Sequence, residues 1–102
     1  MSWTDRRKRM YGAIAQAFAS RTAISAEDFL DIYVEAEPPP PISDFEAQYV
    51  PDRETLDGIL EALGESAGIG EKAASHYDRR ESFAQFAEHL LRAGALGEGR
   101  ES

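Results

Sequence analysis

Residues 52–64, Asp-Arg-Glu-Thr-Leu-Asp-Gly-Ile-Leu-Glu-Ala-Leu-Gly, decide the fold class of this chain. Large apolar side chains recur there at the three- and four-residue spacing that places them on one face of a helix (Leu56, Ile59, Leu60 and Leu63). Asp52 is a residue type that caps helix N-termini, and Gly64 suits the left-handed conformation that ends many helices. The stretch therefore predicts an amphipathic α-helix that Asp52 caps and Gly64 ends.

The outward face of this predicted helix is acidic and carries Glu54, Asp57 and Glu61. It belongs to a wider asymmetry, because residues 27–65 hold twelve acids against one arginine, whereas residues 1–26 hold five basic residues against one acid. An electronegative face attracts a positively charged partner and speeds association with it. We interpret the three acids as a docking surface for a protein that is basic or processes nucleic acids. A contribution to solubility alone is the alternative that stays open.

Three other segments have helical periodicity, and each has a predicted cap. The first follows a capping box at residues 2–5 and carries on one face Met10, Ile14, Ala17 and Phe18. The second follows Ser25 and carries the stripe Phe29, Ile32, Tyr33 and Ala36. The last follows a capping box at residues 78–81, ends at Gly94 and carries Phe83, Phe86, Ala87, Leu90 and Leu91. No segment alternates like a strand, so the sequence predicts an all-α fold, a compact bundle of four to five short helices.

We expect a single helical domain over residues 1–96, followed by a frayed tail at residues 97–102. Its parts are an N-terminal helical pair (1–36), a proline-rich connector (37–51) and the C-terminal helices (52–96). Within the connector, the four consecutive prolines from position 38 favour a stiff polyproline II spacer, and the following residues favour one helical turn.

Composition excludes several classes of protein. The 102 residues include no cysteine, which excludes disulfides, cysteine-ligated zinc, iron–sulfur clusters and thiol catalysis. No apolar run reaches the roughly 18 residues of a membrane span, and the N-terminus lacks the apolar core of a signal peptide. We therefore expect a cytoplasmic protein without membrane contact. A chain of this size buries a limited share of its surface, which leaves a homodimer open.

Patterns for catalysis, metals and cofactors are also missing. Neither His76 nor His89 follows a glutamate by three residues, the spacing that di-iron helix bundles use. The spacing Gly68-x-Gly70-x-x-Ala73 matches a degenerate dinucleotide fingerprint, but a predicted helix precedes it where that motif needs a strand. The sequence thus predicts no cofactor, no metal and no catalytic residue, and the protein is expected not to be an enzyme.

The most informative motif is the stretch LGESAGIGEKAASHY at residues 63–77. It resembles a helix-hairpin-helix, the module by which many DNA repair and replication proteins hold the sugar-phosphate backbone. The resemblance extends more weakly to about residue 92 and does not cover the whole chain. It implies that Gly68, Ile69 and Gly70 form the hairpin, and that Lys72 is its customary basic residue.

Backbone N–H groups at a hairpin of this kind can bind phosphate without regard to sequence and in a salt-sensitive way. The resemblance therefore implies Gly68, Ile69, Gly70 and Lys72 as phosphate-contacting residues, with sequence-independent DNA binding as their function. A glycine-rich connector between two helices is the alternative interpretation of the same residues.

A second resemblance covers residues 13–36, where a helix, the sequence ISAEDF and another helix follow one another. This arrangement is similar to the opening of many winged-helix regulators. It implies a transcription regulator of the helix-turn-helix type, with the helix after Asp52 as the DNA reader. The acids of that helix would repel phosphates, which argues against DNA reading through it.

The sequence favours a small non-catalytic accessory or regulatory protein that binds a protein partner. Nucleic acid is the alternative partner, and we rank it second because the net charge of −8 repels phosphates.

Overall fold

The computed structural model describes residues 3–96, and in that range it contains six α-helices, one π-helical segment and no strand. The helices are α1 (Trp3–Ala19), α2 (Ala26–Phe29), α3 (Ile42–Tyr49), α4 (Arg53–Ala67), α5 (Lys72–Ser75) and α6 (Phe83–Arg92). The π-helical segment η1 (Leu30–Val34) continues α2 without a break. The predicted all-α bundle is confirmed. The predicted capping residue Ser2 and the predicted tail 97–102 lie outside the described residues.

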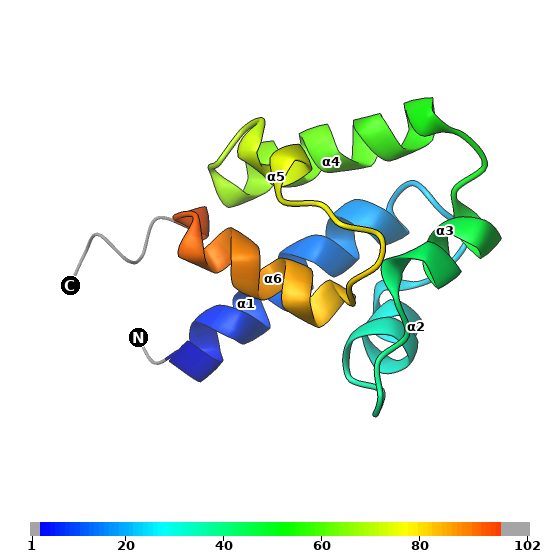
Figure 1. Cartoon of the computed structure of the whole chain (residues 1–102), viewed down its shortest axis with the longest axis horizontal. Helices are drawn as coiled ribbons and strands as arrows, with labels where there is room; N and C mark the ends of the chain where they lie inside the picture. Colours follow the sequence, from blue (N-terminus) through cyan, green and yellow to red (C-terminus); the bar gives the residue numbers. More distant parts are fainter. Residues whose placement is uncertain (1–2, 97–102) are drawn as a thin grey trace.

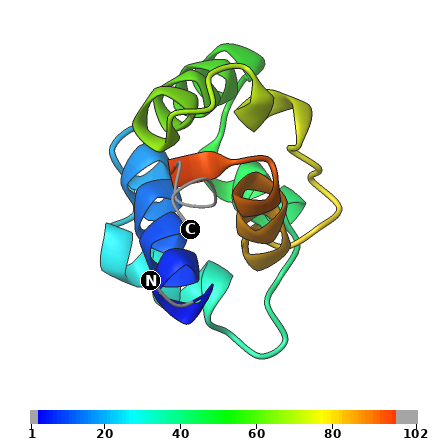
Figure 2. The same cartoon turned by 90° about the vertical axis from the view of Figure 1, so that its left-hand side faces the viewer.

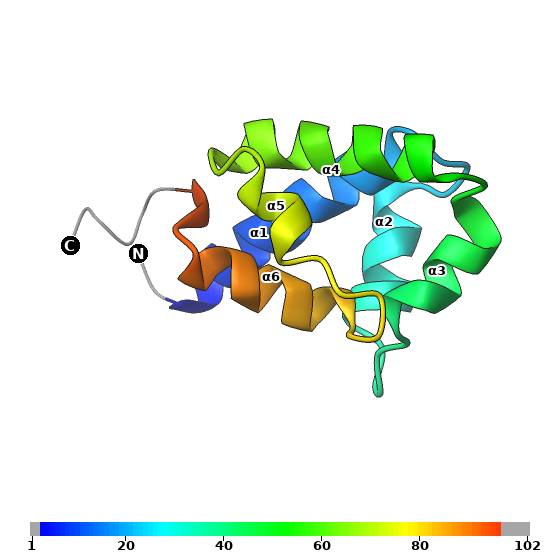
Figure 3. The ribbon, with the colours of Figure 1, turned by 45° about the horizontal axis from the view of Figure 1, so that its top comes forward.

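Helix α1 is the centre of the bundle, and both α4 and α6 pack against it (Figure 1). Figure 2 shows α4 lying over α1 and α6. The segment formed by α2 and η1 also packs against α1, and α5 lies beside α4 (Figure 3). Helix α3 lies at the end of the molecule far from the start of α1 and the end of α6. No strand lies among residues 3–96, so a winged-helix wing is absent from this part of the chain.

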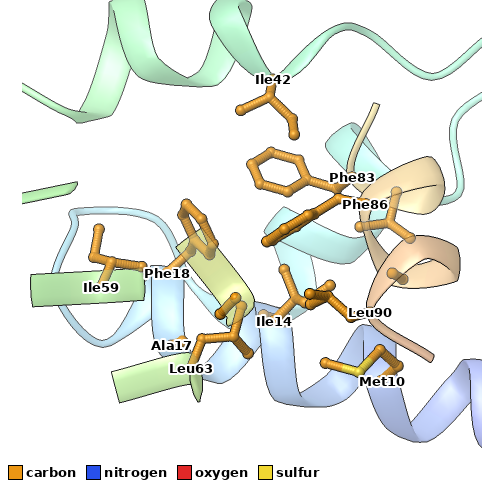
Figure 4. Packing of buried hydrophobic residues seen from close by; sticks show 14 of the residues in the cluster. Met10, Ile14, Ala17, Phe18, Ile42, Ile59, Leu63, Phe83, Phe86 and Leu90 are labelled. Atoms are coloured by element: carbon orange, nitrogen blue, oxygen red, sulfur yellow. The ribbon is translucent and has the colours of Figure 1, made fainter. Parts of the chain in front are cut away.

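One hydrophobic cluster joins these helices, and the phenylalanines form its middle. All five phenylalanines of the chain are fully buried (Phe18, Phe29, Phe45, Phe83 and Phe86). The ring centroid of Phe83 lies 4.9 Å from that of Phe18, 4.7 Å from that of Phe29 and 5.6 Å from that of Phe45. Such offset or edge-on pairs each add about 0.5–1.5 kcal/mol beyond the area that they bury. Figure 4 shows the rings of Phe18, Phe83 and Phe86 gathered in this core.

Helix α4 begins as predicted but ends later than predicted. The Asp52 carboxylate accepts a hydrogen bond from the Thr55 N–H at 2.8 Å, which confirms the cap. The predicted end at Gly64 is wrong, because the helix continues to Ala67 and Gly68 adopts the left-handed conformation with φ 76°. Gly64 stays helical and buried because the chain turns back at Gly68 and brings Gly70 against it.

The second predicted helix changes its type after one turn. Ser25 caps it as predicted, since its hydroxyl accepts a hydrogen bond from the Asp28 N–H at 3.1 Å. The Glu35 N–H then donates to the Leu30 carbonyl oxygen, five residues back, at 2.8 Å. This wider turn rotates the following side chains, so Ile32 is 49% exposed instead of lying in the predicted buried stripe.

The cap of the last helix is also different from the predicted one. Ser82 and Gln85 form the capping box of α6, and the predicted box of Asp78 and Glu81 does not form. The carbonyl oxygens of Arg79 and Glu81 instead accept hydrogen bonds from the first N–H groups of α3, at 2.9 and 2.8 Å. Residues 79–81 therefore run past the start of α3 and cannot be helical.

Between η1 and α4, the connector contains more helix than predicted. Helix α3 spans eight residues, where one turn was expected, and buries Ile42 and Phe45. Pro41, which precedes it, has φ −69° and ψ 156°, the polyproline II conformation that four consecutive prolines favour.

Candidate functional site

The three predicted docking acids lie on one exposed stripe of α4. Glu54, Asp57 and Glu61 are exposed, and Glu65 continues their line one helical turn further. These spacings of three and four residues keep side chains on one helix face, over a length of about 17 Å. We call Glu54, Asp57, Glu61 and Glu65 the acidic stripe. Among the ion pairs of residues 3–96, one involves this stripe: the Arg53 guanidinium lies 2.9 Å from Asp57, and both side chains are exposed.

A pocket of about 310 Å³ opens beside this stripe, between α4 and the turn that leads into α5. It is lined by Asp57, Leu60, Glu61, Glu65, Gly70, Glu71 and Ala74, and we call it the acidic pocket. Leu60 and Ala74 contribute its apolar lining, and four exposed acids (Asp57, Glu61, Glu65 and Glu71) contribute carboxylates that we call the rim carboxylates. Helical spacing alone could have added Glu65 to the predicted set. Glu71 could not have been found in that way, because only the turn at Gly68 brings it to α4.

The predicted phosphate site is located at the same place. Gly68, Ile69 and Gly70 form the turn between α4 and α5, and Gly70 lines the acidic pocket. Their N–H groups donate to carbonyl oxygens at the end of α4: Gly68 to Glu65 at 3.3 Å, and Ile69 and Gly70 to Gly64 at 2.9 and 3.0 Å. These amides therefore close the helix end. They do not project outward, whereas phosphate binding requires N–H groups that do.

Lys72 begins α5, and its surroundings also differ from the expected ones. Its backbone N–H donates to the Ile69 carbonyl oxygen at 3.1 Å. Helix α5 is only four residues long, so it supplies little of the helix dipole that attracts anions. Glu65 and Glu71 stand on the rim next to Gly70, where their charges oppose a phosphate. Phosphate binding here stays a prediction that the local charges oppose.

A second hollow, which we call the polar groove, has a volume of about 760 Å³ and adjoins the acidic pocket at Leu60 and Ala74. Its central feature is Glu46 of α3, whose side chain is only 11% exposed. The Tyr77 hydroxyl donates a hydrogen bond to Glu46, and the Arg79 guanidinium lies 3.1 Å from the same carboxylate. Burial raises the pKa of the Tyr77 hydroxyl well above its ordinary value of 10.0, and the bond to Glu46 raises it further. Tyr77 therefore stays protonated and serves as a donor.

Both histidines of the chain line the polar groove. The His89 imidazole Nε2 lies 3.0 Å from a Glu81 carboxylate oxygen, and this contact connects α6 to the segment that precedes it. Within residues 3–96, no group of three histidine, aspartate or glutamate side chains comes close enough together to hold a metal ion.

Comparison of the chain with protein-family models, with curated proteins and with solved structures gave no match. Among the helices at residues 3–96, none has the length and apolar character needed to cross a bilayer.

Proposed function

We propose that this protein is a small non-catalytic accessory or regulatory protein that binds a basic protein partner through the acidic stripe of α4. The observation that carries the proposal is the exposed alignment of Glu54, Asp57, Glu61 and Glu65 beside a pocket with apolar lining residues. Charge on one face gives fast association and selects against partners of the same sign. Apolar lining residues add the desolvated contact area on which affinity depends.

The surroundings of the stripe favour a protein over a nucleic acid as the partner. Four carboxylates line the acidic pocket together with Gly70, and their charges would repel a phosphate backbone that approaches Gly70. The turn amides already have carbonyl acceptors within the chain. Binding to nucleic acids depends on cations that neutralise phosphates, and the stripe supplies the opposite charge.

The proposal is tested with a charge-reversal variant, Glu54→Lys with Asp57→Lys and Glu61→Lys. The wild type and the variant are used side by side as bait in one cell extract, and each captured protein is then purified and its association rate measured. We expect the reversal to slow association strongly at low salt. The difference should shrink as salt shortens the Debye length to about 8 Å and below.

A matched control reverses three acids elsewhere, Asp31→Lys with Glu35→Lys and Glu37→Lys. These residues lie on η1 and the loop after it, and all three are exposed. The net charge of the control equals that of the stripe variant, so an effect of total charge would slow both equally. Equal rates for the wild type and the stripe variant, at every salt concentration, would overturn the proposed function.

A further inference from the structure

We propose that the acidic pocket receives one lysine or arginine side chain of the partner. Its aliphatic stem would lie on Leu60 and Ala74, and its cationic head would lie among the rim carboxylates. This inference rests on the proposed function, because it names the part of the partner that occupies the surface. It assigns one side chain of the partner to the acidic pocket, in addition to the general attraction between opposite charges.

The shape and composition of the pocket match such a side chain. Two of its lining residues are apolar: Ala74, which is exposed, and Leu60, which has only 4% of its surface accessible. Lysine and arginine bury their methylene stems along apolar surface while the charged end stays near water. An uncharged apolar side chain would fit against Leu60 and Ala74, but it would take water away from the carboxylates and leave them without a partner.

The charges of the rim are also available to a cation from outside. Among the residues that the structure describes, no lysine, arginine or histidine forms an ion pair with Glu61, Glu65 or Glu71. The fourth rim acid, Asp57, pairs with Arg53, and that pair is exposed on both sides. Exposed pairs contribute little, so an incoming guanidinium or ammonium group can replace Arg53.

The number of rim carboxylates favours one cation over the other. A guanidinium group is planar and offers five N–H donors, which suits a site with several carboxylate acceptors. A lysine ammonium group satisfies fewer of them at once. We therefore expect arginine to bind more tightly than lysine.

A small probe tests the pocket without knowledge of the partner. N-acetyl-arginine N-methylamide is titrated into the isotope-labelled full-length protein, and backbone amide shifts are followed by NMR. We expect shifts that saturate at Gly70, Glu71 and Ala74, with a dissociation constant on the order of 1–10 mM. The uncharged citrulline analogue should bind at least about tenfold more weakly. Guanidinium ion alone, which lacks the stem, should shift acidic residues across the surface without saturating at these three.

Ala74→Leu fills the pocket and leaves every charge in place. Because Ala74 is exposed, the larger side chain does not disturb the core. Ala47→Leu on α3 is the matched control, since Ala47 is also exposed and lies outside the pocket. We expect Ala74→Leu to abolish the saturable shifts and Ala47→Leu to preserve them. Saturable binding that survives Ala74→Leu, or shifts spread evenly over all acidic helices, would overturn the proposal that the acidic pocket receives a cationic side chain.

The two proposals fail in different ways. If the partner binds the acidic stripe but places no side chain in the acidic pocket, the triple charge reversal slows association with the captured partner while Ala74→Leu has no effect on it. If the stripe itself is wrong, the charge reversal has no effect on association, whatever the arginine probe does.

Discussion

The carbonyl oxygen of Gly64 accepts hydrogen bonds from the N–H groups of Ile69 and Gly70, at 2.9 and 3.0 Å, while the Gly70 carbonyl group lies directly against the Gly64 Cα. A Cβ atom on Gly64 would stand 2.9 Å from the Gly70 carbonyl carbon, closer than real Cβ contacts allow, and would overlap its oxygen. This contact fixes the turn that brings Glu71 and Ala74 to α4. The acidic pocket therefore depends on the absence of a side chain at position 64.

Gly64→Ala should destabilise the protein by about 3 kcal/mol or more, because backbone atoms cannot move away cheaply from the new methyl group. The expected loss occurs although alanine favours a helix interior by roughly 1 kcal/mol. Gly58→Ala in the same helix is the control, since a Cβ there meets only the Arg21 side chain, at 3.8 Å. It should stabilise the protein by about 0.5–1 kcal/mol. Urea unfolding measures both, and equal effects would show that the turn tolerates a side chain at position 64.

Tyr77→Phe should destabilise the fold by about 1–2 kcal/mol at neutral pH, because the buried carboxylate of Glu46 loses a donor. The variant should also change how the free energy of unfolding falls as pH rises in the alkaline range. The pKa of Tyr77 is higher in the folded than in the unfolded chain, so its contribution is complete below pH 10 and is lost as pH rises above 10.0.

Burial also raises the pKa of Tyr11 and Tyr33, so the wild type should lose stability steeply above pH 10. Tyr77→Phe should reduce the slope of the free energy of unfolding against pH, by up to the equivalent of about one proton per molecule. Denaturant unfolding at a series of alkaline pH values measures it. An unchanged slope would mean that the Tyr77 hydroxyl ionises equally well in the folded chain.

Ser82→Ala should cost about 1–2 kcal/mol, because it removes the hydroxyl that accepts the Gln85 N–H and opens the capping box of α6. Asp78→Ala should cost less, since Asp78 bonds to the exposed Arg80 and does not cap the helix. Thermal unfolding of the two variants gives the order. A larger loss for Asp78→Ala than for Ser82→Ala would favour the capping box that the sequence predicts at residues 78–81.

DNA binding should be undetectable for the wild type at about 10⁻⁴ M protein and low salt, in an anisotropy assay with labelled duplex DNA. The reason is that the amides of Ile69 and Gly70 are bonded to Gly64 and that carboxylates stand beside them. Salt-sensitive binding that Lys72→Ala weakens would revive the helix-hairpin-helix hypothesis. Lys8→Ala is the control for binding to the basic N-terminal segment.

Local signals predicted much of the fold, because their effects lie within a few residues. The caps at Ser25 and Asp52 each depend on a side chain and an N–H three residues apart, so the sequence alone identifies them. The capping box predicted at residues 78–81 was wrong for a non-local reason. Carbonyl groups of that segment bond to the N–H groups of Ile42 and Ser43, nearly forty residues away, and no local pattern contains that information.

The candidate site also has one part that local sequence predicts and another part that depends on a tertiary contact. Glu54, Asp57 and Glu61 share a face by helical spacing alone, so their alignment followed from the sequence. Gly64 was expected to end the helix because glycine commonly does so, yet its role is to admit Gly70. The pocket, and with it the contribution of Glu71, exists only through that tertiary contact.

The position of Phe83 has a consequence for the order of events during synthesis. This ring fills the space among the aromatic side chains of α1, α2 and α3, yet it lies in α6, which is synthesised after all of them. The nascent chain must therefore carry Phe18, Phe29 and Phe45 without their central partner until α6 has been synthesised. During that interval these rings are exposed to chaperones and to one another, and the bundle closes only after α6 has left the ribosome.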